Sequence, residues 1–228
     1  GTVAGVGGAG DGCLAGEAKL EVLVDGAGWW AGGGERTYDG DECQFGVSHL
    51  GQFLLTIALQ SALRWCRLCS GVSSVRRAGH KKGGLDFGSF EGEHGSKAYN
   101  GSKYYAQSKL ANVLFTMELD RRFGEELTTN CLHPGVVGTR LANKKSAPLT
   151  STVWTMYKPF ATTPKKGADT SVYLATSPEV SDVSGRYFDE HQCLQKPSSI
   201  ARNAQLARRL WEFSEQAVAG FLRKEEEE

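Results

Sequence analysis

The sequence predicts an α/β fold in which a mostly parallel sheet is covered by helices on both faces. Short apolar segments suited to buried strands alternate along the chain with longer amphipathic segments suited to helices. Small or polar residues follow three of the strand segments, at residues 25–28, 73–74 and 134–139. Ligands bind beyond the carboxyl ends of the strands in such sheets, so these three loops are expected to line one site.

The expected elements follow from apolar periodicity and from stop signals. Strands are expected at residues 20–24, 67–72, 127–132 and 186–188. Amphipathic patterns predict helices at residues 41–63, 105–123, 165–176 and 200–221, and Gly124 is a plausible stop for the second of them. The segment 76–102 is basic and then rich in glycine, which favours a long surface loop.

Composition limits the class of protein. A chain of 228 residues with 40% hydrophobic content can bury one sizeable core, so a single domain is expected. Lysine plus arginine (26) balances aspartate plus glutamate (26), which gives no electrostatic footprint for nucleic acid. The sequence has neither an apolar run of about 18 residues nor the pattern of a signal peptide, so we expect no membrane span and a cytoplasmic location. The six cysteines are scattered, which suits a reducing compartment, and a lone C-x-x-C at residues 66–69 predicts no metal site.

The first 19 residues differ from the rest of the chain. They are rich in glycine and poor in apolar side chains, so a disordered leader is expected before a domain at residues 20–222 and an acidic tail at residues 223–228. Residues 5–10 spell G-x-G-x-x-G, a pattern typical of dinucleotide binding. That fingerprint requires a strand directly before its first glycine, and only four residues precede Gly5. We therefore expect no phosphate site there.

Tyr105 and Lys109 are the main catalytic candidates. Four residues apart in a helix, their side chains lie on one face, one turn apart. A nearby ammonium favours the phenolate, so the pair is suited to proton transfer near neutral pH, although such pairs also occur as solvated surface residues. Tyr99 and Lys103 have the same spacing, but Asn100-Gly101-Ser102 between them predicts a turn rather than a helix.

Four ordered segments, at residues 40–56, 72–74, 105–116 and 133–139, resemble the short-chain dehydrogenase/reductase superfamily. The similarity covers residues 20 to about 213 and is strongest to the retinol-dehydrogenase-like branch, which includes the oxidoreductase domain of the WW-domain-containing oxidoreductase. It implies a Rossmann fold, an NAD or NADP cofactor with NADP favoured, and hydride transfer between an alcohol and a carbonyl.

The resemblance also implies roles for individual residues. Tyr105 would be the general acid/base, and Lys109 would lower its pKa and bind the nicotinamide ribose. Ser74 would hydrogen-bond the substrate oxygen. Ser48 stands at the position of the family asparagine that anchors a proton-relay water.

Further residues would bind the cofactor and the substrate. The substrate-binding segment would contribute Trp154 and Tyr157 to an apolar cover, which implies a lipophilic retinoid-, steroid- or lipid-like alcohol or carbonyl. Homodimers are possible. The residues that would flank the cofactor are Ala27, Gly28, Pro134, Gly135, Val137 and Thr139.

The sequence departs from the family pattern in two further ways. The glycine-rich turn and about two βα units before residue 20 are absent, which predicts an N-terminally truncated Rossmann fold and an exposed sheet edge at residues 20–24. The family's N-N-A-G loop is D-G-A-G here, so Asp25 places a carboxylate beside the sheet. An alternative function therefore stays open, that of a non-catalytic dehydrogenase-like protein with an interaction role.

Overall fold

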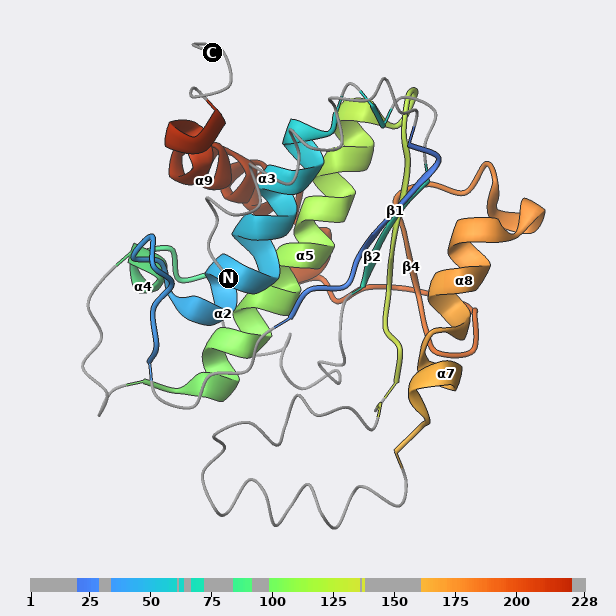
Figure 1. The fold of residues 1–228 in the computed structure, drawn as a ribbon, viewed down its shortest axis with the longest axis horizontal. Helices are drawn as coiled ribbons and strands as arrows, with labels where there is room; N and C mark the ends of the chain where they lie inside the picture. The colour runs from blue at the N-terminus through green and yellow to red at the C-terminus, as the bar shows by residue number, and fades with distance from the viewer. Residues whose placement is uncertain are drawn as a thin grey trace.

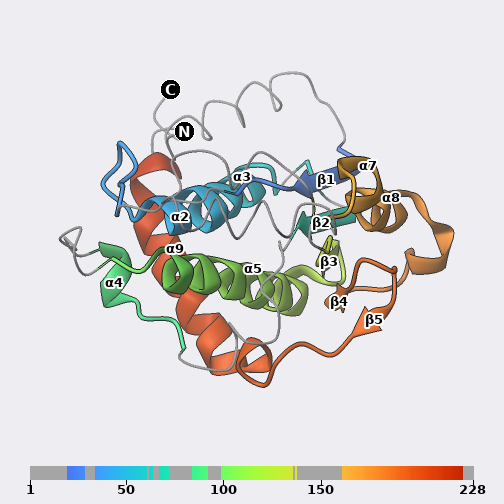
Figure 2. The same ribbon diagram turned by 90° about the horizontal axis from the view of Figure 1, so that it is seen from below.

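The computed structural model describes residues 20–28, 34–60, 62–63, 67–71, 84–91, 99–135, 137 and 161–222. Five strands form one sheet in the order β1-β2-β3-β4-β5 (Figures 1 and 2). The first four strands pair in parallel, and β5 pairs antiparallel with β4. The strands are β1 (Val22–Asp25), β2 (Arg67–Gly71), β3 (Thr128–Leu132), β4 (Arg186–Phe188) and β5 (Leu194–Gln195).

Helices cover both faces of the sheet, as predicted. On one face lie α5 (Gly101–Phe123) and a continuous helical stretch made of α2 (Cys43–Phe45), the π-helical Gly46–Leu50 and α3 (Gly51–Ala58). On the other face α7 (Pro164–Gly167) and α8 (Asp169–Thr176) lie beside β1 and β2 (Figure 2). The predicted helix at 165–176 is thus two consecutive helices.

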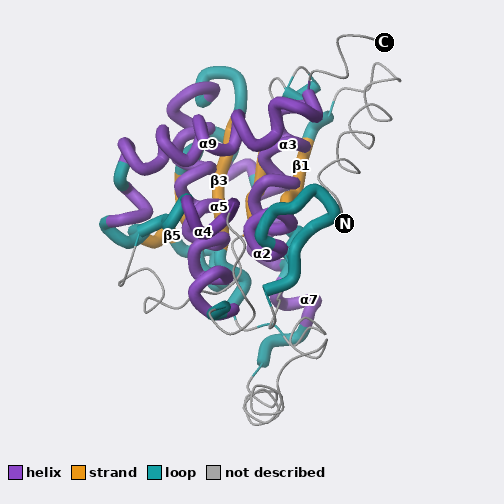
Figure 3. The backbone as a smooth tube through the Cα atoms, turned by 90° about the vertical axis from the view of Figure 1, so that its left-hand side faces the viewer, coloured by secondary structure: helices purple, strands orange, loops and turns teal. Residues whose placement is uncertain are grey.

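A third layer is formed by α9 (Ala204–Leu222), which packs on α5 and α3 and makes no extensive contact with the sheet. Figure 3 shows the molecule from the side of α9 and α4 (Gly88–Glu91), with the strands behind these helices. The main core cluster fills the space between α3, α5 and α9, and its largest fully buried side chains include Phe45, Phe53, Phe90, Leu114 and Leu119. Short 3-10 turns at Pro178–Val180 and Ile200–Arg202 complete the described fold.

Helix α5 begins earlier than predicted. Asn100 is its N-cap, and the Asn100 side chain accepts a hydrogen bond from the Lys103 backbone N–H at 3.1 Å. The predicted turn at residues 100–102 is therefore wrong, because Gly101 and Ser102 form the first turn of the helix. The predicted stop is confirmed: Gly124 is the C-cap, and its N–H bonds the Asp120 carbonyl at 2.8 Å.

The predicted long loop at residues 76–102 also needs correction, because it contains α4 and the start of α5. The sequence analysis missed β5, a strand of only two residues with exposed side chains. The helix expected at 200–221 begins as a 3-10 turn and becomes α-helical only from Ala204. These differences lie at the ends of elements and leave the predicted order of strands and helices intact.

The register of the parallel strands brings their carboxyl ends to one edge of the sheet. Asp25 of β1 lies beside Ser70 of β2, and Ser70 lies beside Cys131 of β3. The loops that follow β1 and β3 therefore leave the sheet at the same edge. This is the edge at which the sequence places the ligand site.

Strand β1 is an edge strand of the described sheet, as expected. Its side chains alternate: Leu23 packs against the core, whereas Val22 and Val24 point to the other face and are 36% and 49% exposed. Helix α8 touches β1 but leaves these two valines largely uncovered. Across the described helices, none is both long and apolar enough to cross a membrane.

Candidate active site

Lys109 is the most unusual residue at the carboxyl edge of the sheet. Its side chain is 1% exposed, and its ammonium lies 5.6 Å from the centre of the Tyr105 ring. Both residues lie on α5, one helical turn apart, as their spacing predicts. Among the described residues no carboxylate lies within ion-pair distance of this ammonium. Burial lowers the pKa of Lys109 to about 8, so the ammonium still predominates at neutral pH.

Tyr105 lies at the border of the protein interior. Its side chain is half-buried, whereas Ser108 and Lys109 further along the same helix are buried. Tyr105 is thus in part exposed to solvent, whereas the ammonium beside its ring is buried. A proton-transferring group needs this combination of access on one side and a fixed charge on the other.

The second Y-x-x-x-K pair is built differently. Tyr99 lies before the N-cap of α5, and its hydroxyl donates to Glu42 Oε1 at 2.6 Å and accepts from Gln44 Nε2 at 2.7 Å. Lys103 pairs with Asp86 at 3.0 Å, and both of these side chains are 53% exposed. The members of this pair thus have separate partners. The choice of Tyr105 and Lys109 over this pair stays a prediction.

The loop after β1 lies directly against Lys109. A Cβ on Gly28 would lie 3.3 Å from the Lys109 ammonium nitrogen, so glycine permits this close approach. The Ala27 carbonyl accepts a hydrogen bond from Gln52 Nε2 at 2.9 Å, which ties the loop to α3. Gln52 was not predicted as part of the site; its signal in the sequence is its place one helical turn from Ser48, His49 and Thr56, which form a polar face on a largely apolar helix.

This part of the site fits the ribose end of a nicotinamide cofactor. It offers a buried ammonium, whose charge hydroxyl oxygens can satisfy, and beside it a glycine whose Cβ, if present, would lie 3.3 Å from the ammonium nitrogen. The Gly5–Gly10 stretch, the only G-x-G-x-x-G pattern considered for the phosphates, lies outside the described residues. Metal chemistry receives no support in the described ranges, where no group of three or more His, Cys, Asp or Glu side chains could hold an ion.

Asp25 is buried, as its position at the end of β1 requires. Its side chain is 4% exposed, and the Thr56 hydroxyl donates to Oδ2 at 3.3 Å. Burial raises the pKa of Asp25 to about 7, and the hydrogen bond from Thr56 opposes this rise only in part. The carboxylate predicted beside the sheet is thus half-protonated near neutral pH.

One local hydrogen bond and one backbone conformation define the loop after β3. His133 Nδ1 accepts a hydrogen bond from the Gly135 N–H at 2.8 Å, and Gly135 has φ of +76°, which favours glycine. Burial lowers the pKa of His133, and the charges of Glu190 and Asp189 oppose this shift. Pro134 and Gly135 therefore occupy a fixed turn at the carboxyl end of β3.

Val137 continues this loop toward the other face of the sheet. It forms a parallel bridge with Thr162, and a Cβ on Gly167 of α7 would come within 2.5 Å of its side chain. Ser48 is fully buried in the π-helical segment. Its expected role in anchoring a relay water stays a prediction. Four predicted site residues lie outside the described residues: Ser74, Thr139, Trp154 and Tyr157. The role expected for Ser74 at the substrate oxygen is therefore untested.

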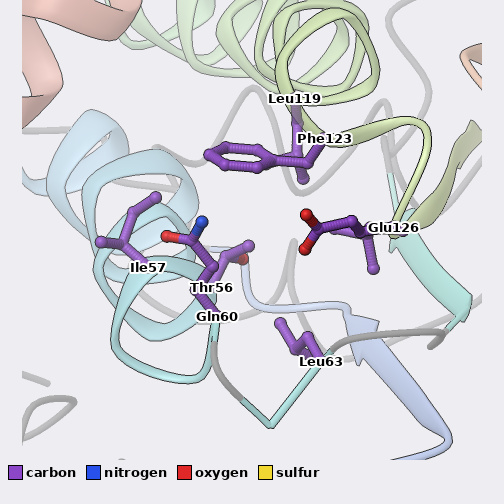
Figure 4. A pocket seen from close by; sticks show the side chains of 8 residues that line it. Thr56, Ile57, Gln60, Leu63, Leu119, Phe123 and Glu126 are labelled. Atoms are coloured by element: carbon purple, nitrogen blue, oxygen red, sulfur yellow. The ribbon is translucent and has the colours of Figure 1, made fainter.

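A small pocket lies at the opposite edge of the sheet, near the start of β3 (Figure 4). It opens between the carboxyl-terminal ends of α3 and α5, with Ile57, Gln60, Phe123 and Glu126 among its lining residues. It is separate from Tyr105 and Lys109 and is not part of the candidate site.

Comparisons with known proteins relate most of the chain to retinol dehydrogenases. No family model matches the chain. The chain is 42% identical to retinol dehydrogenase 14 of Homo sapiens over 217 residues, which cover 91% of the chain and 61% of that protein. It is 38% identical to retinol dehydrogenase 12 of Homo sapiens over 206 residues, or 90% of the chain and 63% of that protein. The chain thus spans about three fifths of the length of these curated relatives.

Solved structures with the same fold include short-chain dehydrogenases. An uncharacterized protein from Mycobacterium Paratuberculosis superposes with a TM-score of 0.69 at 27% identity, over 95% of this chain and 72% of that one. A short chain dehydrogenase from Escherichia coli CFT073 complexed with NADPH superposes with a TM-score of 0.59 at 18% identity, over 83% and 70% of the two chains.

Proposed function

From the premise that this chain belongs to the short-chain dehydrogenase/reductase superfamily, we propose that it carries the catalytic half of an NAD(P)-dependent oxidoreductase that interconverts a lipophilic alcohol and its carbonyl. The observation that supports this most directly is the buried Lys109 ammonium beside the half-buried Tyr105 ring. A cation in that position lowers the stability of the fold and serves no described ion pair. Stabilisation of the Tyr105 phenolate during proton transfer would account for this cation.

In the proposed reaction Tyr105 gives its phenolic proton to the carbonyl oxygen during reduction and takes a proton from the alcohol during oxidation. Lys109 stabilises the phenolate that forms, because its positive charge is held close in a poorly solvated position. Ser74 would hydrogen-bond the substrate oxygen, and Ser48 would take part in supplying protons from solvent.

The cofactor supplies or accepts the hydride when it is bound. Lys109 would bind the ribose hydroxyls, and the loop after β1 with Ala27 and Gly28 would flank the ring. The loop after β3 would contribute Pro134, Gly135, Val137 and Thr139. NADP is favoured over NAD, in keeping with three neighbouring structures that carry NADP or NADPH.

We propose a retinoid-like substrate because the similar curated proteins are named retinol dehydrogenases. The segment after Thr139 is rich in aromatic side chains, and Trp154 and Tyr157 would contact the hydrophobic part of such a substrate.

Retinal reduction with NADPH or NADH tests this function. Tyr105→Phe removes only the acidic hydroxyl and is expected to lower kcat by about 10²–10⁴-fold, the usual range for a general acid. Tyr99→Phe removes the hydroxyl of the other pair and is expected to leave kcat within about twofold, since the hydrogen bonds described for this hydroxyl join it to Glu42 and Gln44. Equal losses in the two variants would refute the role of Tyr105.

A non-catalytic role is the competing proposal. It is favoured by the exposed valines of the β1 edge, a surface suited to pairing with another chain. Cooperative unfolding without any turnover or cofactor binding in the unaltered chain would favour this second proposal over the first.

A further inference from the structure

The turn that follows β3 is closed by the side chain of His133. Nδ1 of His133 accepts a hydrogen bond from the Gly135 N–H at 2.8 Å, and Pro134 between them has no N–H to offer. The backbone N–H of His133 donates to the Phe188 carbonyl at 2.9 Å, which fixes His133 beside β4. Gly135 itself is buried and has φ of +76°. A side-chain hydrogen bond thus shapes the backbone at the carboxyl edge of the sheet.

This hydrogen bond decides the tautomer of the imidazole. A backbone N–H can only donate, so Nδ1 of His133 must offer its lone pair and cannot carry a proton. The ring proton of the neutral form is therefore on Nε2. A cationic ring would carry a proton on both nitrogens, and an Nδ1–H group would then face the Gly135 N–H. The closed turn and the charged ring exclude each other.

The other nitrogen of the ring faces a carboxylate. Nε2 of His133 lies 4.0 Å from Glu190 Oε2, and the His133 and Glu190 side chains are 18% and 40% exposed. At that distance the two groups interact through charge and not through a hydrogen bond. Glu190 also packs on the turn itself, because a Cβ on Gly135 would lie 3.3 Å from the Glu190 Cβ.

Glu190 is held in place by the turn between β4 and β5. Asp189 Oδ1 accepts hydrogen bonds from the backbone N–H groups of His191 and Cys193, at 2.9 and 3.0 Å. These two bonds fold the backbone around Glu190. The carboxylate is therefore presented to His133 by an ordered turn.

The charge on His133 is set by opposing effects. Among the described residues, Glu190 and Asp189 are the charged groups that act on the ring, and both favour its cation. Burial disfavours the cation and has the larger effect, so the pKa of His133 lies below that of an ordinary histidine. The Gly135 N–H opposes the cation as well, since it needs the lone pair of Nδ1. The ring is therefore neutral at neutral pH, as the closed turn requires.

We propose that His133 is a positioning residue: its neutral ring holds the Pro134–Gly135 turn closed through Nδ1, and a proton added at Nδ1 releases that turn. Glu190 attracts this proton and so raises the pH at which the release occurs. Only the consequence for the cofactor, which the turn would flank, rests on the proposed function. The tautomer, the closed turn and its release are properties of the protein alone.

The tautomer and the release are tested by ¹⁵N NMR of the unaltered protein. At neutral pH the expected result for His133 is a protonated Nε2 and an unprotonated Nδ1. As the pH falls, the Gly135 amide resonance should shift with the midpoint of His133. Its hydrogen exchange, corrected for the intrinsic rate at each pH, should quicken by roughly three- to tenfold, the equivalent of one hydrogen bond. A protonated Nδ1 in the neutral ring, or a Gly135 amide that does not follow the His133 titration, would overturn the proposal.

Two substitutions separate the hydrogen-bond acceptor from the titrating ring. His133→Asn keeps a side-chain oxygen that can accept from the N–H two residues on, and this oxygen does not titrate. It should keep the Gly135 amide protected and remove the pH dependence of its exchange. His133→Leu has no acceptor and should leave the amide unprotected at every pH. Loss of protection in both variants would assign the effect to packing of the ring and contradict the proposal. If His133→Leu does not fold, His133→Asn and the titration of the unaltered protein decide the question.

Glu190→Gln and His191→Asn test which neighbour acts on the ring. Glu190→Gln removes a charge that favours the cation, so the midpoint of His133 should fall. His191 is an exposed histidine on the same turn between β4 and β5, which makes His191→Asn the matched control. It should leave the titration of the Gly135 amide unchanged. A His133 midpoint that does not fall in Glu190→Gln would refute the part given to Glu190, and loss of the Gly135 titration in His191→Asn would refute the part given to His133.

NADPH binding is the readout that rests on the proposed function. Between neutral pH and a pH below the His133 midpoint, the affinity of the unaltered protein should fall roughly three- to tenfold further than that of His133→Asn. The comparison cancels the titration of the cofactor phosphate, which is the same for both proteins. Equal pH dependence in the two proteins, or no NADPH binding at all, would count against the proposed function alone, because the Gly135 measurements need no cofactor.

Discussion

Lys109 and Glu118 are two charged residues of the same helix whose side chains are each 1% exposed, and their surroundings are opposite. Arg121 contacts Glu118 at 2.5 and 2.8 Å, and Arg122 does so at 2.8 Å. Burial alone would raise the pKa of Glu118, but the two arginines outweigh it and lower the pKa. For Lys109 no such compensation is described, and burial lowers its pKa to about 8.

The difference separates a structural charge from a functional one. A buried charge with hydrogen-bonded partners holds neighbouring turns of a helix in place, as Glu118 does for the last turns of α5. A buried charge without described partners lowers the stability of the folded state. In the reaction that we propose, the partners of this charge would be a phenolate and a cofactor hydroxyl.

The largest expected effect on stability comes from Asp25, a third buried charge. The folded pKa of Asp25, about 7, is above its unfolded value of 3.8. The contribution of Asp25 to the free energy of unfolding is therefore fully present below pH 4 and is lost as the pH rises toward 7. Asp25→Asn is expected to change stability little at pH 4 and to raise it by up to about 4 kcal/mol at pH 8. Urea unfolding at both pH values measures this, with the exposed Asp182→Asn as control. A gain of the same size at both pH values would contradict the account.

Lys109→Met should give the next largest effect. Its folded pKa of about 8 is below the unfolded value of 10.5, so this residue opposes folding most below pH 8 and least above pH 10.5. The substitution is expected to raise the free energy of unfolding by up to about 3 kcal/mol at pH 7 while activity is lost. Thermal and urea unfolding measure the gain. A clear loss of stability would show that Lys109 has a structural partner and would end the contrast with Glu118.

Glu118→Gln should act in the opposite direction. The neutral amide is a weaker partner for the two arginines than the carboxylate. Because both arginines are partly exposed, we expect the free energy of unfolding to fall by about 1–2 kcal/mol. The loss should shrink as the pH falls through the lowered pKa of Glu118, since the unaltered carboxylate is then protonated. Cofactor affinity should not change. Substitution of the exposed Glu125 by Gln is the control. A loss of cofactor affinity in Glu118→Gln would show that Glu118 also affects the site, which would contradict the contrast with Lys109.

The smallest effect is expected at the β1 edge. Val24→Lys places a charge on an exposed edge strand and should alter stability by no more than about 0.5 kcal/mol. It should reduce self-association, measured by light scattering against protein concentration. Val172→Lys on α8, where the valine is 57% exposed, is the control. Equal reduction by both variants would assign the effect to net charge instead of to the edge.

The sequence was sufficient for the four parallel strands, the order of the main elements and the placement of Tyr105 and Lys109 on one helix face, because apolar periodicity and helical spacing are local properties. The start of α5 was predicted too late: Asn-Gly-Ser suits a turn, and here its asparagine caps a helix. The two-residue strand β5 has no apolar pattern of its own and depends on β4 for its pairing.

The hydrogen bonds of Gln52 to Asn112 and to the Ala27 carbonyl could not be predicted, because α3, α5 and the loop after β1 are brought together only by the tertiary fold. The same holds for the contrast between Lys109 and Glu118. Burial and partners depend on packing that helical spacing does not encode.

The central proposal is that the buried Lys109 ammonium binds the cofactor. Titration of intrinsic fluorescence with NADPH and NADH in the unaltered protein, Lys109→Met and Lys103→Met tests it most directly. Lys103 lies on the same helix with its ammonium paired to Asp86 at the surface. The account predicts cofactor binding that Lys109→Met weakens by about tenfold or more and that Lys103→Met leaves within about twofold. Equal affinity in Lys109→Met and the unaltered protein would contradict it.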